Sequence, residues 1–252
     1  MSKRTEADMA AAGSGKRWRV PAVVLAGAFA VGLAVFAFIF LGEPSGGSQL
    51  ERVFDQVRQM PLVGVVLAEN PGLEAQVRQA IKDEIANPTR SGPSRVFLLG
   101  AHLRQQYIVP ALRDSDDAPA LDSVKNMEAL VLHLQASDVA ACREFGAVGL
   151  TRPDKLDPQG AAIFKHALAA QEEAYRSGKA AAQKRDAPDN QQIKGLLAEA
   201  GYQQDDFQHL ANYRDLSASE ACAAMVKIYA APAVLPPERG AIVARYLLTV
   251  SQ

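Results

Sequence analysis

Two cysteines are the residues of this chain best suited to a defined chemistry. They are Cys142 and Cys222, 80 residues apart, and the sequence holds no third cysteine. In an oxidising compartment an even number of cysteines favours a disulfide, and closing a loop of about 80 residues would constrain the unfolded chain by at most about 4–5 kcal/mol. Two buried free thiols are the alternative, because unpaired cysteine packs as a small apolar residue. We predict a disulfide between Cys142 and Cys222.

The histidines and paired acids have simpler interpretations than catalysis. No histidine belongs to a recognised metal or haem motif, and His133, between two leucines, is expected to be partly buried and hydrogen-bonded. Paired acids suit general acid–base catalysis only if burial raises the pKa of one of them. Here their positions, in solvent or in the first turn of a helix, account for the paired acids without catalysis. The sequence therefore predicts no catalytic residue, cofactor or metal site. The pairs are Asp116-Asp117, Glu172-Glu173 and Asp205-Asp206.

A rival hypothesis assembles a site from dispersed residues on facing helices, in an envelope enzyme or in a bundle that binds a hydrophobic small molecule. No nucleophile elbow, Gly-rich phosphate loop or dinucleotide-binding motif supports it. The residues available to such a site are His102, His133, His166, Glu128, Glu144, Glu172 and Asp205.

The location of the protein is indicated by 22 consecutive uncharged residues, Val20 to Leu41. A helix of that length is about 33 Å long, enough to cross a hydrocarbon core of about 30 Å. The apolar stretch is longer than that of a signal peptide, and no A-x-A cleavage site follows it. We therefore predict a transmembrane helix over residues 20–41.

Charges on either side of this segment predict its orientation. Five Lys or Arg residues precede it, and the first basic residue after it is Arg52. The positive-inside rule then places residues 1–19 in the cytoplasm and residues 42–252 outside it. Residues 42–48 form a Gly/Ser linker that holds residues 49–252 close to the bilayer. Small residues four apart, such as Ala22, Ala26 and Ala30, make a homodimer one candidate partnership.

The rest of the chain has a helical pattern nearly throughout, which predicts an all-α fold of about 8–10 helices in a bundle. Met60-Pro61 is expected to interrupt the first helix, and Asn70 to cap the helix that follows Pro71. Segments 87–94 and 114–119 are predicted loops. The clearest amphipathic stripe lies between the second of these loops and Ser137: Leu121, Val124, Met127, Leu130, Val131 and Leu134.

Two segments resemble each other at an offset of 80 residues. Each has a capped helix that carries a cysteine, followed by a helix that begins with proline and then Gly160 or Gly240. We interpret them as two related αα-hairpins. The expected helix starts are Asp138, Asp157 and a capping box of Ser217 with Glu220. The basic run from Arg176 to Arg185 is interpreted as a solvated helix end.

Composition excludes some functions and favours one. Beyond residue 42 the chain has 22 basic and 26 acidic residues, a net charge of −4, without the basic patch that nucleic-acid binding needs. The favoured hypothesis is a membrane-anchored helical interaction or scaffold domain of a bacterial cell envelope, without enzymatic activity of its own. It predicts an inner-membrane location, a periplasmic domain, other envelope proteins as partners, and no cofactor.

Overall fold

The structure is a computed structural model that describes residues 49–89, 94–150 and 156–250. Most of these residues are helical and none forms a strand, so the all-α bundle-like prediction is confirmed. The predicted anchor, residues 20–41, and the linker lie outside the described residues, and none of the described helices has the length and apolar character of a membrane span. The helices are α2 (Gln49–Gln59), α3 (Val63–Glu69), α4 (Gly72–Ala86), α5 (Arg95–Leu103), the π-helical η1 (Arg104–Ile108), α6 (Val109–Asp114), α7 (Asp117–Ser137), α8 (Val139–Val148), α9 (Pro158–Ala180), α10 (Asn190–Glu199), α11 (Gln204–Ala211), the 3₁₀ turn η3 (Tyr213–Asp215), α12 (Ala218–Val234) and α13 (Pro237–Thr249).

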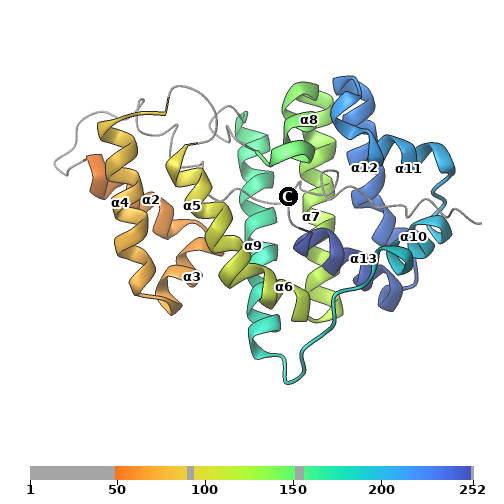
Figure 1. The fold of residues 1–252 in the computed structure, drawn as a ribbon, viewed down its shortest axis with the longest axis horizontal. Coiled ribbons are helices and arrows are strands. Elements are labelled where there is room, and N and C mark those ends of the chain that lie inside the picture. Colours follow the sequence, from red (N-terminus) through yellow and green to blue (C-terminus); the bar gives the residue numbers. More distant parts are fainter. Residues whose placement is uncertain (1–48, 90–93, 151–155, 251–252) are drawn as a thin grey trace, which may run out of the picture.

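Helices α2–α5 form an N-terminal lobe, residues 49–103, on one side of α9 (Figure 1). The predicted break at Met60-Pro61 is confirmed, since α2 ends at Gln59 and α3 begins at Val63. Between them Leu62 is buried with a φ of 62°, which is uncommon for a non-glycine residue. Its N–H donates to Glu172 Oε2 of α9 at 3.0 Å, so this turn also fastens the lobe to α9.

The predicted cap at Asn70 is wrong. Its side-chain amide donates to the carbonyl of Val66 at 2.8 Å, so Asn70 completes the end of α3 instead of the start of α4. Pro71 precedes α4 with helical backbone angles. Proline fits there because the backbone N–H that it lacks would have no partner within the helix at this position. The asparagine side chain of an Asn-Pro pair between two helices can cap either helix. Here it binds the carbonyl of Val66 in the last turn of α3.

Helices α6–α13 form the C-terminal bundle, in which α7 packs against α9, α12 and α13. The prediction for α7 is confirmed, because Val124, Met127 and Leu134 of its stripe are buried. Helix α9 runs antiparallel to α7: His133 bonds to Asp157 at one end, and Asp116 N–H donates to Ser177 Oγ at the other. Helices α5, η1 and α6 follow one another without a break and connect the lobe to the bundle (Figure 1).

Two glycines allow helices of the bundle to cross closely. A Cβ on Gly178 of α9 would overlap the carbonyl of Ala111 in α6, and one on Gly240 of α13 would overlap the carbonyl of Pro232 in α12. Because neither neighbour is a flexible side chain, the backbones themselves would have to separate. The bundle therefore depends on glycine at both crossings.

Three further predictions need correction. The expected loop at 114–119 is only a break at Ser115-Asp116, since Pro119 fits the first turn of α7. The predicted hairpins pack differently: α12 lies against α13, whereas α8 packs mainly on α12 and α7, and α9 on α7 and α6. The segment after α9 is not simply solvated, because Lys184 Nζ lies 3.0 Å from Asp114 and Arg185 N–H donates to the same carboxylate.

Candidate functional site: a disulfide-braced groove

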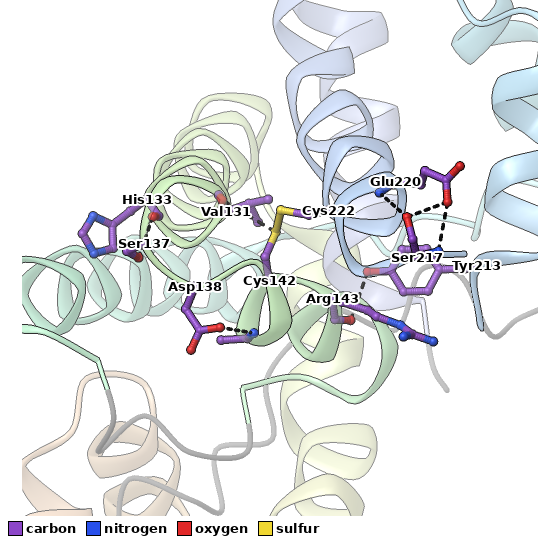
Figure 2. The surroundings of a disulfide bond; sticks show 11 residues. Val131, His133, Ser137, Asp138, Cys142, Arg143, Tyr213, Ser217, Glu220 and Cys222 are labelled. Carbon is purple, nitrogen blue, oxygen red and sulfur yellow. Dashed lines mark hydrogen bonds between the residues drawn. A yellow bond between two sulfur atoms is a disulfide. The ribbon is translucent and has the colours of Figure 1, made fainter. Parts of the chain in front are cut away.

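Cys142 of α8 and Cys222 of α12 are joined in a disulfide, with their Cα atoms 5.4 Å apart (Figure 2). Both residues are fully buried, and Cys142 Sγ lies 3.8 Å from the carbonyl of Val131 in α7. The bond therefore lies where α7, α8 and α12 meet. Burial keeps reductants away from the sulfur atoms, which suits a structural cross-link better than a catalytic one.

Local sequence positions both cysteines near the starts of capped helices, Cys142 as the fourth residue of α8 and Cys222 as the fifth of α12. Asp138 accepts a hydrogen bond from Ala141 N–H at 2.9 Å and starts α8. Ser217 and Glu220 form the predicted capping box at the start of α12. Tyr213 reaches across from η3 and donates its hydroxyl to the carbonyl of Arg143 at 3.0 Å, so α8 is held on both sides of the bond (Figure 2).

A groove of about 400 Å³ runs beside α7, along the corner where α12 turns into α13. Its apolar lining comes from a buried tyrosine, two prolines and aliphatic side chains, and Val234 at the same corner is 66% exposed. The corner has this shape because Pro232 lies in the last turn of α12 and Pro236-Pro237 starts α13. The apolar lining is Leu121, Val124, Tyr229, Pro232, Ala233, Leu235 and Pro237.

Charged side chains of α7 border the groove. Asp122, Lys125 and Glu128 are spaced by three, which places them along one side of the helix. Burial raises the pKa of Glu128, and the positive charge of Lys125 lowers it in part. Glu128 forms no hydrogen bond within the part of the chain that the structure describes. The groove thus combines an apolar floor with a carboxylate that a basic group could pair.

A second cavity, of about 50 Å³, lies inside the N-terminal lobe. Aliphatic side chains from α2, α3, α4 and α5 line it, and on α5 the neighbouring Leu98 is 55% exposed. Val57, Val66, Leu67, Val77, Val96 and Leu103 are among the lining residues.

The residues proposed for a dispersed site are not brought together. His102 and His166 are exposed on α5 and α9, and Asp205 is exposed at the start of α11. His133 is mostly buried, as expected, and its Nε2 lies 2.9 Å from Asp157 Oδ1, the cap of α9. Across the described ranges no three His, Cys, Asp or Glu side chains are arranged to hold a metal ion.

Two of the remaining acids, Glu172 and Glu144, lie outside the groove. Glu172 binds Leu62 N–H and pairs with Arg176, and although burial opposes ionisation these contacts lower its pKa. Glu144 is half-buried on α8. Glu128 lines the groove beside α7. Sequence reasoning proposed Glu128 as a candidate residue but did not place it at a groove. The three prolines at the α12–α13 corner were the available signal.

No protein-family model, curated protein or solved structure matches this chain significantly. The functional argument therefore depends on the geometry of this molecule.

Proposed function

We propose that the protein is a single-pass anchor of the bacterial inner membrane whose residues 49–252 form a periplasmic docking domain for another envelope protein, without enzymatic activity. The observation that carries the docking role is the groove beside α7. Its apolar area would bury aliphatic side chains of a partner, which is the main source of affinity in such interfaces. Glu128 adds a preference for a partner segment that places Lys or Arg next to its apolar residues.

The proposed location is supported by the sequence before residue 49 and by the disulfide. Residues 20–41 are long and apolar enough to span a bilayer, with basic residues on one side. A disulfide between buried cysteines suits a compartment outside the reducing cytoplasm. Both features agree with an exported domain on a short tether.

Photo-crosslinking in cells tests the docking role. A benzophenone amino acid replaces Val234 at the groove, or Leu132 as the control, since Leu132 is 44% exposed on α7 outside the groove. We expect a discrete product with an envelope protein from position 234 that Glu128→Lys removes. The same product from position 132, or a product insensitive to Glu128→Lys, would contradict the proposal. A C-terminal reporter active only in the cytoplasm would contradict the location.

The cavity in the N-terminal lobe favours a second candidate function, the binding of a small aliphatic molecule. Its lining is almost entirely apolar, and an apolar cavity can take a hydrocarbon group. We would measure thermal stabilisation by short-chain alcohols, with Val66→Phe as a variant that fills the cavity. Stabilisation that persists in Val66→Phe would contradict this function.

A further inference from the structure

Helix α3 of the N-terminal lobe is tied to α9 at both of its ends. At its start, the Leu62 N–H donates to Glu172 Oε2 at 3.0 Å. At its end, Glu69 accepts from the Tyr175 hydroxyl at 2.6 Å, and Lys179 Nζ lies 3.5 Å from the same carboxylate. None of these residues lines the groove beside α7, so the docking proposed there does not account for the contacts.

The turn that leads into α3 is strained. Val63 N–H donates to the carbonyl of Pro61 at 2.6 Å, and Leu62 between them has a φ of 62° and a ψ of −51°. This is a γ-turn with a positive φ at its central residue, a rare conformation that costs energy when that residue is not glycine. Leu62 is fully buried, so its packing and the bond to Glu172 hold the turn in this form. Removing the bond therefore favours a relaxed turn.

Glu172 divides its two oxygens between the lobe and its own helix. Oε2 accepts from Leu62, whereas Oε1 accepts from Arg176 Nε at 2.9 Å and from Arg176 Nη2 at 2.8 Å. Two charge-assisted bonds from one guanidinium fix the orientation of the carboxylate. Arg176 is therefore a positioning residue that presents Glu172 to the strained turn.

One side of α3 forms a wall of the lobe cavity. Val63, Val66 and Leu67 line the cavity together with Val77 of α4 and Val96 of α5. All five side chains are buried, so little of the lining reaches solvent while α3 stays in place. The same short helix thus follows the strained turn, contacts α9 at both ends and closes the cavity.

We propose that α3 is a gate of the lobe cavity, latched on α9 at its start by Glu172 and at its end by Tyr175. When the latch is released, the turn at residues 61–63 relaxes, α3 moves away from α9 and the cavity opens. The inference deepens the second candidate function, the binding of a small aliphatic molecule, and rests on it only for what enters. Opening is measured without such a molecule, so failure of the gate is distinguishable from failure of alcohol binding.

Thiol labelling of the detergent-solubilised full chain measures opening of the gate. Val66→Cys places a thiol in the cavity wall, and Val131→Cys places a matched thiol in α7, where Val131 is fully buried. Cys142 and Cys222 are bonded to each other, so N-ethylmaleimide reports only the added thiol. The labelling rate of each thiol is followed by mass spectrometry.

Two substitutions weaken the latch while nearly keeping side-chain size. Glu172→Gln should raise the labelling rate at Val66→Cys about tenfold, because a neutral amide replaces the charged acceptor. Tyr175→Phe should raise it about fivefold, because the bond to Glu69 is lost. Glu173→Gln, at an exposed position of the same helix, is the control and should leave the rate unchanged.

The thiol of Val131→Cys separates local opening from a general loss of stability. The gate requires that its labelling rate stays unchanged in Glu172→Gln and in Tyr175→Phe. Equal acceleration at Val66→Cys and Val131→Cys would overturn the proposal, as would a rate at Val66→Cys that neither substitution raises. Hydrogen exchange of residues 63–69, in chains without an added cysteine, is the second measurement and should increase in the same order.

Discussion

The N-terminal lobe and the C-terminal bundle hold their helices together by different means. In the lobe, helices of 7–15 residues surround a cavity of about 50 Å³. In the bundle, α7 and α9 extend over 21 and 23 residues, neighbouring helices cross at glycines, and a disulfide lies close to α7. Polar contacts connect the two parts, among them Tyr175 hydroxyl to Glu69 at 2.6 Å.

This difference indicates a division of roles. A closely packed, cross-linked bundle keeps a binding groove in a fixed shape, which lowers the entropy cost of docking. A lobe of short helices around a cavity opens at lower free energy, although its apolar core is continuous with that of the bundle. We therefore expect perturbations of the bundle to have larger effects on global stability than matched perturbations of the lobe.

The largest effect is expected from the disulfide. Replacing both Cys142 and Cys222 with alanine should lower the free energy of unfolding by about 2–5 kcal/mol, because the loop of 80 residues is no longer constrained. Hydrogen exchange should increase first in α8 and α12. A larger increase in exchange rate in α4 than in α8, relative to the unsubstituted protein, would contradict the division between lobe and bundle.

Two glycines provide the next comparison. Gly178→Ala should cost about 2–3 kcal/mol, since its Cβ would overlap the backbone of α6. Gly195→Ala is the matched control in α10, where nothing lies within 4 Å of the added Cβ. That substitution should stabilise by about 0.5–1 kcal/mol through helix propensity. Urea unfolding measures the change in the free energy of unfolding for both variants. A loss of similar size in both would contradict the claim that the crossing of α9 and α6 requires glycine.

A buried acid in the lobe should make it sensitive to pH. Glu84 is 1% exposed and accepts from Arg95 N–H at 2.9 Å and from Thr89. Although burial opposes ionisation, these bonds lower its pKa from 4.5. Its contribution is therefore present above pH 4.5 and is lost as the pH falls through the lower folded-state pKa.

Glu84→Gln should accordingly cost about 1–3 kcal/mol at pH 7 and less at pH 3. Hydrogen exchange in α4 and α5 at the two pH values measures this loss. Asp83→Asn, at the adjacent half-buried position on the same helix, is the control and should change exchange little at either pH. An equal loss of stability for Glu84→Gln at both pH values would show that the ionised Glu84 carboxylate does not stabilise the lobe.

The smallest effect concerns one added methylene. Val77→Ile extends into the lobe cavity and should stabilise by at most about 0.8 kcal/mol. Val131→Ile in α7, where Val131 is fully buried and lines neither the groove nor the lobe cavity, should instead destabilise. Thermal unfolding of the pair compares the packing of the two regions, and two stabilising substitutions would show that the bundle also has free space.

Sequence reasoning predicted the helical fold and many helix starts, because caps and prolines act locally. Asp138, Asp157 and the Ser217–Glu220 box start α8, α9 and α12 as expected. It predicted about 8–10 helices, whereas the described residues form twelve α-helices. Short breaks such as Ser115-Asp116 leave almost no compositional signal.

The candidate sites were largely beyond sequence reasoning. The cysteines were paired from their number and expected compartment, but nothing local indicates that α12 turns next to Leu121 and Glu128. The groove arises from contacts between residues 121–128 and residues 229–237, which lie far apart in the sequence. Such contacts depend on how helices cross, which the spacing of apolar residues does not specify.

Arg104 has a consequence for how the chain reaches its final form. This buried guanidinium, in the π-helical turn, donates to the carbonyl of Leu248, 144 residues later, near the end of the last helix. Burial lowers its pKa to about 10, so at neutral pH the charge remains and requires that carbonyl. Leu248 must therefore be synthesised before the Arg104 guanidinium gains this partner. The contact closes a chain segment of 144 residues, so it forms late relative to the local contacts of the N-terminal lobe.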